Sequence, residues 1–368
     1  MKYSVYQPSL TGNEKKYVNE CIDSTWISSK GHFINDFERA FASYIGVDFA
    51  TGVCNGTVAL HLAGSALGLG GGDEVIVPSF TYIASANPFL QLGCKIVFCD
   101  SLKSTWQMDY DDIRRKITPK TRAIVVVHLY GHPCDMDEIM TIAKEHNLFV
   151  IEDCAEAIGS EYKGKKVGSF GDIACFSFFG NKTITCGEGG MVLCNDKELD
   201  YRIKHLKGQG VVSYREYWHD IPAYNYRMTN IQAAIGLAQF EQIDRFVEKK
   251  IKIASWYKEM LKDTPLVFHD CASNVKHSYW MVSVLARNQQ EQQSLRKYLL
   301  EKGIETRPTF PCIHQMPVYN QKYIKLDIAE DISARGINLP SYPALEQNDI
   351  SNITESIKDY FIQGGIYK

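Results

Sequence analysis

The apolar positions near the amino terminus recur at helical spacing. Phe33, Phe37 and Phe41 fall on one face of a predicted helix, and Gly46 is its stop signal. A preceding amphipathic helix is predicted over residues 11–26, because its first four residues have capping-box spacing. Two helices are therefore expected before the first strand.

From residue 49 onward, short apolar runs alternate with helical patterns. Strands are predicted at residues 49–54, 74–77, 95–98, 123–127, 148–151, 174–178 and 191–194, and helices at 57–67, 83–92 and 136–145. Apolar runs without polar interruption are typical of strands that are buried on both faces. The pattern predicts an α/β domain with a central, mostly parallel sheet between helical layers.

The pattern changes after residue 229. Thr229 is a predicted N-cap, and a long helix over residues 243–261 leads away from the sheet. A strand at 280–285 and helices at 289–301 and 350–361 then predict a smaller α+β domain. A chain of 368 residues usually forms two domains, and we place the division between residues 1–245 and 246–368.

Composition narrows the class of protein. Apolar residues make up 45% and charged residues 23%, as in soluble globular proteins. The net charge of −3 argues against a nucleic-acid surface. Eleven dispersed cysteines without zinc-ligand spacing predict reduced thiols and no metal site. No signal peptide or membrane-length apolar run occurs in the sequence, so a cytoplasmic enzyme without membrane contacts is expected.

One lysine follows an apolar strand and precedes a glycine-rich turn. This residue, Lys182, comes after Asp153, an acid that ends another apolar run. An acid that can hold a pyridine nitrogen, with an amine that can form a Schiff base, suggests pyridoxal phosphate chemistry. The alternative is a surface lysine after a buried strand, which describes most lysines.

Other candidate residues stand where predicted strands end. Asn55, Gly56 and Thr57 form a strand-to-helix turn that can bind a phosphate through free backbone N–H groups, or can be an ordinary cap. Tyr82 can stack on a flat ring or belong to the core. Ser177 can donate its hydroxyl to the phosphate. Neither a P-loop nor a dinucleotide fingerprint is present in the sequence.

Five ordered motifs resemble the DegT/StrS-type sugar aminotransferases along almost the whole chain. They are residues 55–60, residues 72–78, Glu152-Asp153-Cys154-Ala155-Glu156, Gly187-Glu188-Gly189-Gly190 and Asn225-Tyr226-Arg227-Met228-Thr229-Asn230. The resemblance implies the fold-type I architecture and pyridoxal 5'-phosphate as cofactor. It also implies that Lys182 is the catalytic Schiff-base lysine and that Asp153 pairs with the pyridine nitrogen.

The remaining cofactor contacts are implied by the same resemblance. Tyr82 matches the ring-stacking aromatic, and Gly56, Thr57 and Ser177 match the phosphate cradle. Glu156 stands where other members carry Gln or His near the ring hydroxyl. Asn225 matches a residue that reaches the phosphate of the neighbouring subunit, so a homodimer with shared active sites is expected.

Residues 180–185 and Glu156 are most similar to those of members that aminate GDP-4-keto-6-deoxymannose with L-glutamate. In the carboxyl-terminal part, Arg307 and His314 lie in a segment that resembles the sugar-nucleotide site, and the alternative for both is a structural role. Two other functions stay open. One is amination of a UDP- or dTDP-linked keto sugar, and the other is a regulatory protein that binds pyridoxal phosphate without turnover.

Overall fold

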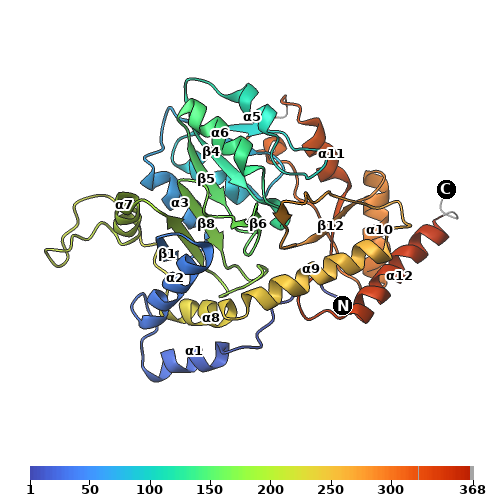
Figure 1. The fold of residues 1–368 in the computed structure, drawn as a ribbon, viewed down its shortest axis with the longest axis horizontal. Helices are drawn as coiled ribbons and strands as arrows, with labels where there is room; N and C mark the ends of the chain where they lie inside the picture. Colours follow the sequence, from blue (N-terminus) through green and yellow to red (C-terminus); the bar gives the residue numbers. More distant parts are fainter. Residues whose placement is uncertain (322, 365–368) are drawn as a thin grey trace.

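The computed structural model describes residues 1–321 and 323–364 and contains a central seven-stranded sheet (Figure 1). Its strands are β1 (Phe49–Val53), β2 (Glu74–Pro78), β3 (Lys95–Cys99), β4 (Thr121–Val127), β5 (Phe149–Asp153), β8 (Ile173–Ser177) and β9 (Gly190–Cys194). Their order is β1-β9-β8-β5-β4-β2-β3. β9 is antiparallel to both neighbours, and the pairs from β8 to β3 are parallel. The predicted mostly parallel sheet is confirmed.

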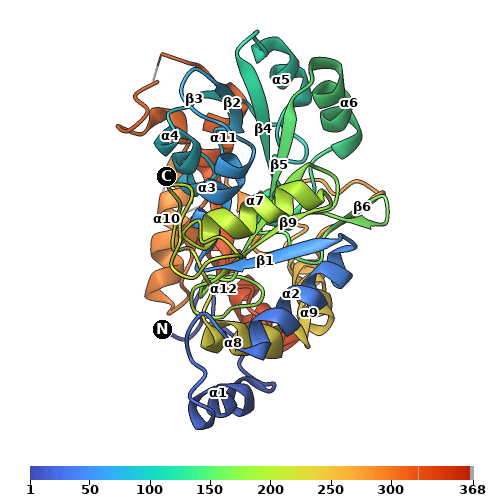
Figure 2. The same ribbon diagram turned by 90° about the vertical axis from the view of Figure 1, so that its left-hand side faces the viewer.

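Helices cover both faces of this sheet. They are α2 (His32–Ile45), α3 (Gly56–Ala66), α4 (Asn87–Gln91), α5 (Tyr110–Lys116), α6 (Met136–His146), α7 (Lys197–Lys207) and α8 (Asn230–Phe240), and α1 (Glu14–Asp23) packs on α8. Alternate residues of each strand face opposite layers. In β9, Val192 packs into the cluster that contains residues of α3 and α7, whereas Met191 packs with α2 and α8. Helices α7 and α2 therefore lie on either side of β1 (Figure 2).

Some predicted helix details differ from the structure. The capping box at Thr11 is wrong, because Asn13 is the N-cap of α1 and the Thr11 hydroxyl donates to Gln242 on another segment. The helix predicted at residues 83–92 is a 3₁₀ turn, η1 (Ile83–Ser85), followed by α4. The predicted N-cap at Thr229 is confirmed, and it forms a capping box with Gln232.

The carboxyl-terminal part has its own core. A four-stranded antiparallel sheet has the order β10-β12-β14-β13. The strands are β10 (Val267–Phe268), β12 (Val282–Leu285), β13 (Arg307–Pro308) and β14 (Gly336–Leu339). The helices of this part are α10 (Gln289–Glu301), α11 (Asp327–Arg335) and α12 (Gln347–Gln363). A third, small sheet joins β6 (Glu161–Tyr162), β7 (Lys165–Lys166) and β11 (Val275–Lys276).

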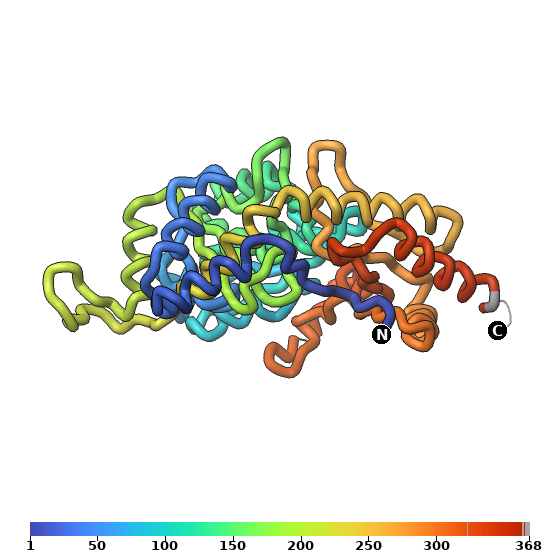
Figure 3. Tube along the Cα trace, turned by 90° about the horizontal axis from the view of Figure 1, so that it is seen from below, coloured from blue at the N-terminus to red at the C-terminus, as the bar shows by residue number. Residues whose placement is uncertain are grey.

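Helix α9 (Ile243–Met260) runs from the large sheet to this second core (Figure 1). The division predicted at residues 245 and 246 falls inside α9 and stays a prediction. The amino-terminal residues cross in the other direction, since Tyr3 pairs with Ile304 and packs in the carboxyl-terminal core. Figure 3 shows this segment passing along the molecule to the carboxyl-terminal part. None of the helices among the described residues is long and apolar enough to cross a membrane.

Lys250 lies where α9 passes between the two cores, and it has no exposed surface. Its Nζ donates to the carbonyl of Ser341 at 2.7 Å, and burial lowers the pKa of Lys250 to about 7. Unfolded lysine has a pKa of about 10.4. Between these values the unfolded chain binds the additional proton, so this residue makes the free energy of unfolding rise with pH.

We expect Lys250→Met to raise the free energy of unfolding near neutral pH by more than about 1 kcal/mol, because it removes a buried charge. The gain should shrink as the pH approaches about 10, where the lysine is neutral in both states. Urea denaturation at several pH values measures this. Lys252→Met, at an exposed position of the same helix, is the control. An equal, pH-independent change in both variants would contradict the interpretation.

Candidate active site

Lys182 lies in the connection between β8 and β9, and its side chain points into the protein interior. Nζ is 3.8 Å from a carboxylate oxygen of Glu156 and 4.0 Å from the ring centroid of Trp280. Burial lowers the pKa of Lys182, and the carboxylate of Glu156 opposes this shift. The amine is therefore closer to its neutral, nucleophilic form than an exposed lysine would be.

Asp153 ends β5 with its carboxylate almost fully buried. Ser85 donates its hydroxyl to one oxygen at 2.7 Å, and the N–H of Ala155 donates to the other at 3.1 Å. Burial raises the pKa of Asp153, and the Ser85 hydrogen bond opposes that shift. A carboxylate held in the interior by neutral donors is suited to a charged partner such as a protonated ring nitrogen.

Glu156 lies in the turn that follows Asp153, and its carboxylate faces Lys182. One of its oxygens accepts a hydrogen bond from the N–H of Tyr130 at 2.8 Å. Burial raises the pKa of Glu156 to about 7, while Lys182 pulls it downward. This carboxyl group can therefore hold or release a proton near neutral pH.

A tight turn, where β1 leads into α3, packs against the end of β8. The Asn55 side chain caps α3 by accepting from the N–H of Val58 at 3.0 Å, and the helix begins at Gly56. A Cβ placed on Gly56 would lie 2.6 Å from Cβ of Ser177, and one on Gly190 would lie 2.6 Å from the carbonyl oxygen of Asn55. Glycine thus keeps the helix N-terminus close to β8 and β9. The first-turn N–H groups and the helix dipole favour an anion here.

A row of aromatic rings, here called the aromatic wall, extends from Trp280, beside Lys182, through Tyr130 and Phe310 to Tyr82. Tyr82 is 57% exposed and its ring lies 5.6 Å from Phe310. Phe310 stacks on Tyr130 at 5.5 Å, and Tyr130 stacks on Trp280 at 6.1 Å. Sequence reasoning found Tyr82 but missed Ser85, Tyr130 and Trp280. Only Tyr130, shortly after the end of β4, offered a signal of the kind used for the other candidates.

Sequence and structure comparisons identify relatives along almost the full chain. The profile of the DegT/DnrJ/EryC1/StrS aminotransferase family matches residues 8–358. The chain belongs to this family. GDP-perosamine synthase of Escherichia coli O157:H7 is 59% identical over 98% of this chain and 99% of its own. The Vibrio cholerae enzyme of that name is 48% identical over 97% and 98%.

A solved structure of similar architecture is the putative sugar aminotransferase Spr1654 from Streptococcus pneumoniae in its PMP form. It has a TM-score of 0.91 and 26% identity, and the likeness covers 96% of this chain and 98% of that one. Members of the family are pyridoxal-phosphate-dependent aminotransferases. The residues of this chain fit that cofactor. The glycine-lined helix N-terminus accommodates a phosphate, and the buried Asp153 carboxylate suits the protonated ring nitrogen.

Two residues of the family motifs lie at the surface. Asn225 is exposed, and its amide oxygen accepts from Nε of Arg227 at 2.9 Å. Arg307 is half exposed on β13, and its guanidinium lies 3.6 Å from Glu305. Both side chains are therefore accessible, and the contacts expected for them stay predictions.

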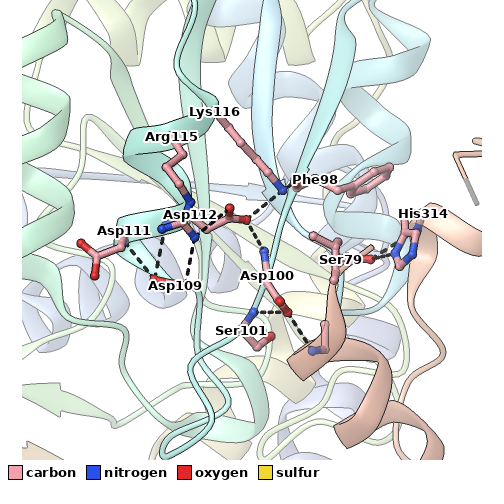
Figure 4. Close-up of polar contacts among 12 residues, drawn as sticks. Ser79, Phe98, Asp100, Ser101, Asp109, Asp111, Asp112, Arg115, Lys116 and His314 are labelled. Atoms are coloured by element: carbon pink, nitrogen blue, oxygen red, sulfur yellow. Dashed lines mark hydrogen bonds and ion pairs between the residues drawn. The ribbon is translucent and has the colours of Figure 1, made fainter. Parts of the chain in front are cut away.

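His314 corrects a sequence prediction (Figure 4). Its ring is fully buried, Nδ1 shares a 2.6 Å hydrogen bond with the Ser79 hydroxyl, and Nε2 lies 3.4 Å from Glu330. This histidine fastens η3 (Ile313–Gln315) to the end of β2. A ring without exposed surface cannot contact a hexose, so His314 is a structural residue.

One group of potential metal ligands occurs among the described residues, namely His128, Glu152 and Cys154. The Glu152 carboxylate accepts three backbone N–H groups from residues 168–171 and lies 3.1 Å from Nε2 of His128. The N–H of Cys134 donates to the other ring nitrogen of His128. The Glu152 and His128 side chains therefore already have protein partners. Glu152, on β5, holds the loop of residues 168–171 in place.

We expect Gly56→Ala to weaken pyridoxal phosphate binding by roughly tenfold or more, because the added methyl group separates the helix N-terminus from Ser177 and disturbs the phosphate cradle. Absorbance titration of the apo-protein with the cofactor measures the change. Gly71→Ala is the matched control, since a Cβ there meets open space. Equal affinity of both variants would exclude this turn as the phosphate site.

Proposed function

We propose that this protein transfers the amino group of L-glutamate to C4 of GDP-4-keto-6-deoxy-D-mannose, giving GDP-perosamine and 2-oxoglutarate. The buried Lys182 amine, set between Glu156 and Trp280, supports the aminotransferase chemistry. The choice of sugar rests on the 59% identity to a GDP-perosamine synthase over 98% of the chain. Perosamine synthesis belongs to O-antigen, and hence lipopolysaccharide, biosynthesis.

When bound, pyridoxal phosphate supplies an electron sink beside the carbon that loses or gains a proton. Lys182 holds the cofactor covalently at rest and, once released, moves the proton. Its Nζ would move a proton from the α-carbon of glutamate to the cofactor in the first half-reaction, and from the cofactor to C4 of the sugar in the second. The lowered pKa of Lys182 makes a neutral amine available for the first of these steps.

The two carboxylates have separate tasks in this proposal. Asp153 keeps the ring nitrogen protonated through a buried charge-assisted hydrogen bond. Glu156 would lie beside the ring hydroxyl and, with a pKa of about 7, would exchange a proton with the neighbouring Lys182 amine. Tyr82 would stack on the ring face, and Gly56, Thr57 and Ser177 would hold the phosphate.

Arg307 is the proposed contact for the diphosphate of the sugar nucleotide. It lies three residues before Phe310, which packs beside Tyr82, and its guanidinium is half exposed. A guanidinium binds diphosphate oxygens bidentately. The exposed Asn225 is proposed to reach the cofactor phosphate in a partner subunit, which makes the active enzyme a homodimer. All eleven cysteines are free thiols, which supports a reducing, cytoplasmic location.

The test is an amination assay with pyridoxal phosphate, L-glutamate and GDP-, UDP- or dTDP-linked 4-keto-6-deoxy sugars. We expect the GDP sugar to be used with a kcat/KM at least about tenfold above the others. Lys182→Ala should lower turnover by more than about a thousandfold, because the proton carrier is lost. Borohydride reduction and mass spectrometry should find the cofactor on Lys182 in the wild-type protein.

Lys163→Ala, at an exposed lysine paired with Asp137, is the control for this assay. Normal turnover by Lys182→Ala would exclude the assignment. Exclusive use of a UDP or dTDP sugar would exclude the GDP sugar as substrate, while the assignment as an aminotransferase would stand. Cofactor binding without any conversion of glutamate would indicate a regulatory protein.

Mixing two inactive variants tests the shared active site. Lys182→Ala and Asn225→Ala should each be inactive or strongly impaired alone. In a heterodimer one site contains both substitutions and the other contains neither, so refolding a mixture of equal amounts should restore about a quarter of wild-type activity. Absence of any recovery, with dimers shown by light scattering, would place Asn225 in its own subunit's site or outside the site.

A further inference from the structure

The first residues of the chain form a strap that is fixed to the carboxyl-terminal core. We call residues 2–6 the N-terminal strap. The N–H of Tyr3 donates to the carbonyl of Gly303 at 3.0 Å, and the N–H of Glu305 donates to the main-chain carbonyl of Tyr3 at 2.8 Å. The N–H of Val5 donates to the Glu305 carboxylate at 3.0 Å. These bonds hold the strap in place like an additional strand.

The strap ends at Tyr6, and the hydroxyl of Tyr6 donates to the main-chain carbonyl of Lys182. The Tyr6 ring packs against the hydrophobic cores of both the large and the carboxyl-terminal parts. Burial raises the pKa of Tyr6, so the hydroxyl keeps its proton and remains a donor across the working pH range. Tyr6 therefore connects the carboxyl-terminal core directly to the backbone of the active-site lysine.

A second side chain fixes the carbonyl one residue earlier. Nε1 of Trp280 donates to the carbonyl of Asn181 at 2.7 Å, while its ring faces the Lys182 amine. The N–H of Lys182 donates to the carbonyl of Phe179 at 2.9 Å. The backbone on both sides of the Lys182 Cα is thus restrained by groups that come from distant parts of the sequence.

We propose that Tyr6 is a positioning residue for Lys182, an inference that rests on the proposed function. The hydroxyl is the one donor recorded for this partly buried carbonyl among the described residues, and without it the turn would be free to rotate toward another donor. Rotation would move the ε-amine out of its place between Trp280 and Glu156. The amine would gain water, and its pKa would return toward that of an ordinary lysine.

The apo-protein gives a readout that needs neither cofactor nor substrate. Trace labelling of lysines with acetic anhydride at several pH values, followed by mass spectrometry, reports the apparent pKa of Lys182. In Tyr6→Phe this pKa should rise, and amide hydrogen exchange of residues 179–186 should accelerate about tenfold. Tyr3→Phe is the matched control, because the Tyr3 hydroxyl bonds Asn352 on α12 and should leave both values unchanged.

In the holoenzyme, Tyr6→Phe should lower kcat about tenfold and leave KM for the sugar nucleotide within about twofold, since the proton carrier is displaced and the substrate contacts are not. A wild-type labelling profile and exchange rate in Tyr6→Phe would overturn the proposal. Glu305→Ala, which loosens the strap without altering Tyr6, should shift the labelling in the same direction and serves if Tyr6→Phe does not fold. Failure of the wild-type protein to transaminate would refute the proposed function but leave the labelling result readable.

Discussion

The burial of one amine is the constraint on which the active site depends. An ammonium group in the protein interior is costly unless carboxylates accompany it, and carboxylates there need their own donors. Glu156 accompanies Lys182 and is held by the N–H of Tyr130, while Asp153 is held by Ser85 and Ala155. Each polar group therefore requires the next, and the aromatic wall that excludes water makes all of these interactions stronger.

The large and the carboxyl-terminal parts must keep the same relative position for this arrangement to persist, because both contribute side chains to it. The large sheet supplies the lysine and both acids, whereas Trp280 and Phe310 come from the carboxyl-terminal part. Away from the lysine, the same two parts are joined around β3 (Figure 4). There the Asp100 carboxylate accepts from the N–H of Ala329 at 2.8 Å and thereby caps α11, whose own N-cap, Leu326, has no polar side chain.

Most of the sheet could be predicted from the sequence because its strands are uninterrupted apolar runs, such as Ile173–Ser177. The sequence did not predict helices α5, α7 and α11, because their charged residues obscure the helical spacing of the apolar ones. In α7 (Lys197–Lys207), for example, only three positions are buried. The sequence placed Gly56, Asp153 and Lys182 after predicted strands, and in the structure they follow β1, end β5 and follow β8; their contacts with the cofactor stay predictions. The role of His314 could not be inferred, because its partner Ser79 is 235 residues away in the chain.

The reversed strand β9 has a consequence for how the chain acquires its reactivity. Because β9 is antiparallel to β8, Lys182 lies in a short return connection, whose contacts are close in sequence and cost little loop entropy to form. The Trp280 and Tyr6 contacts join residues far apart in the chain and are expected to form more slowly. Because the pKa of Lys182 is lowered by burial, we expect the amine of a chain without these contacts to be protonated like that of an exposed lysine, and to become a better nucleophile when folding is complete.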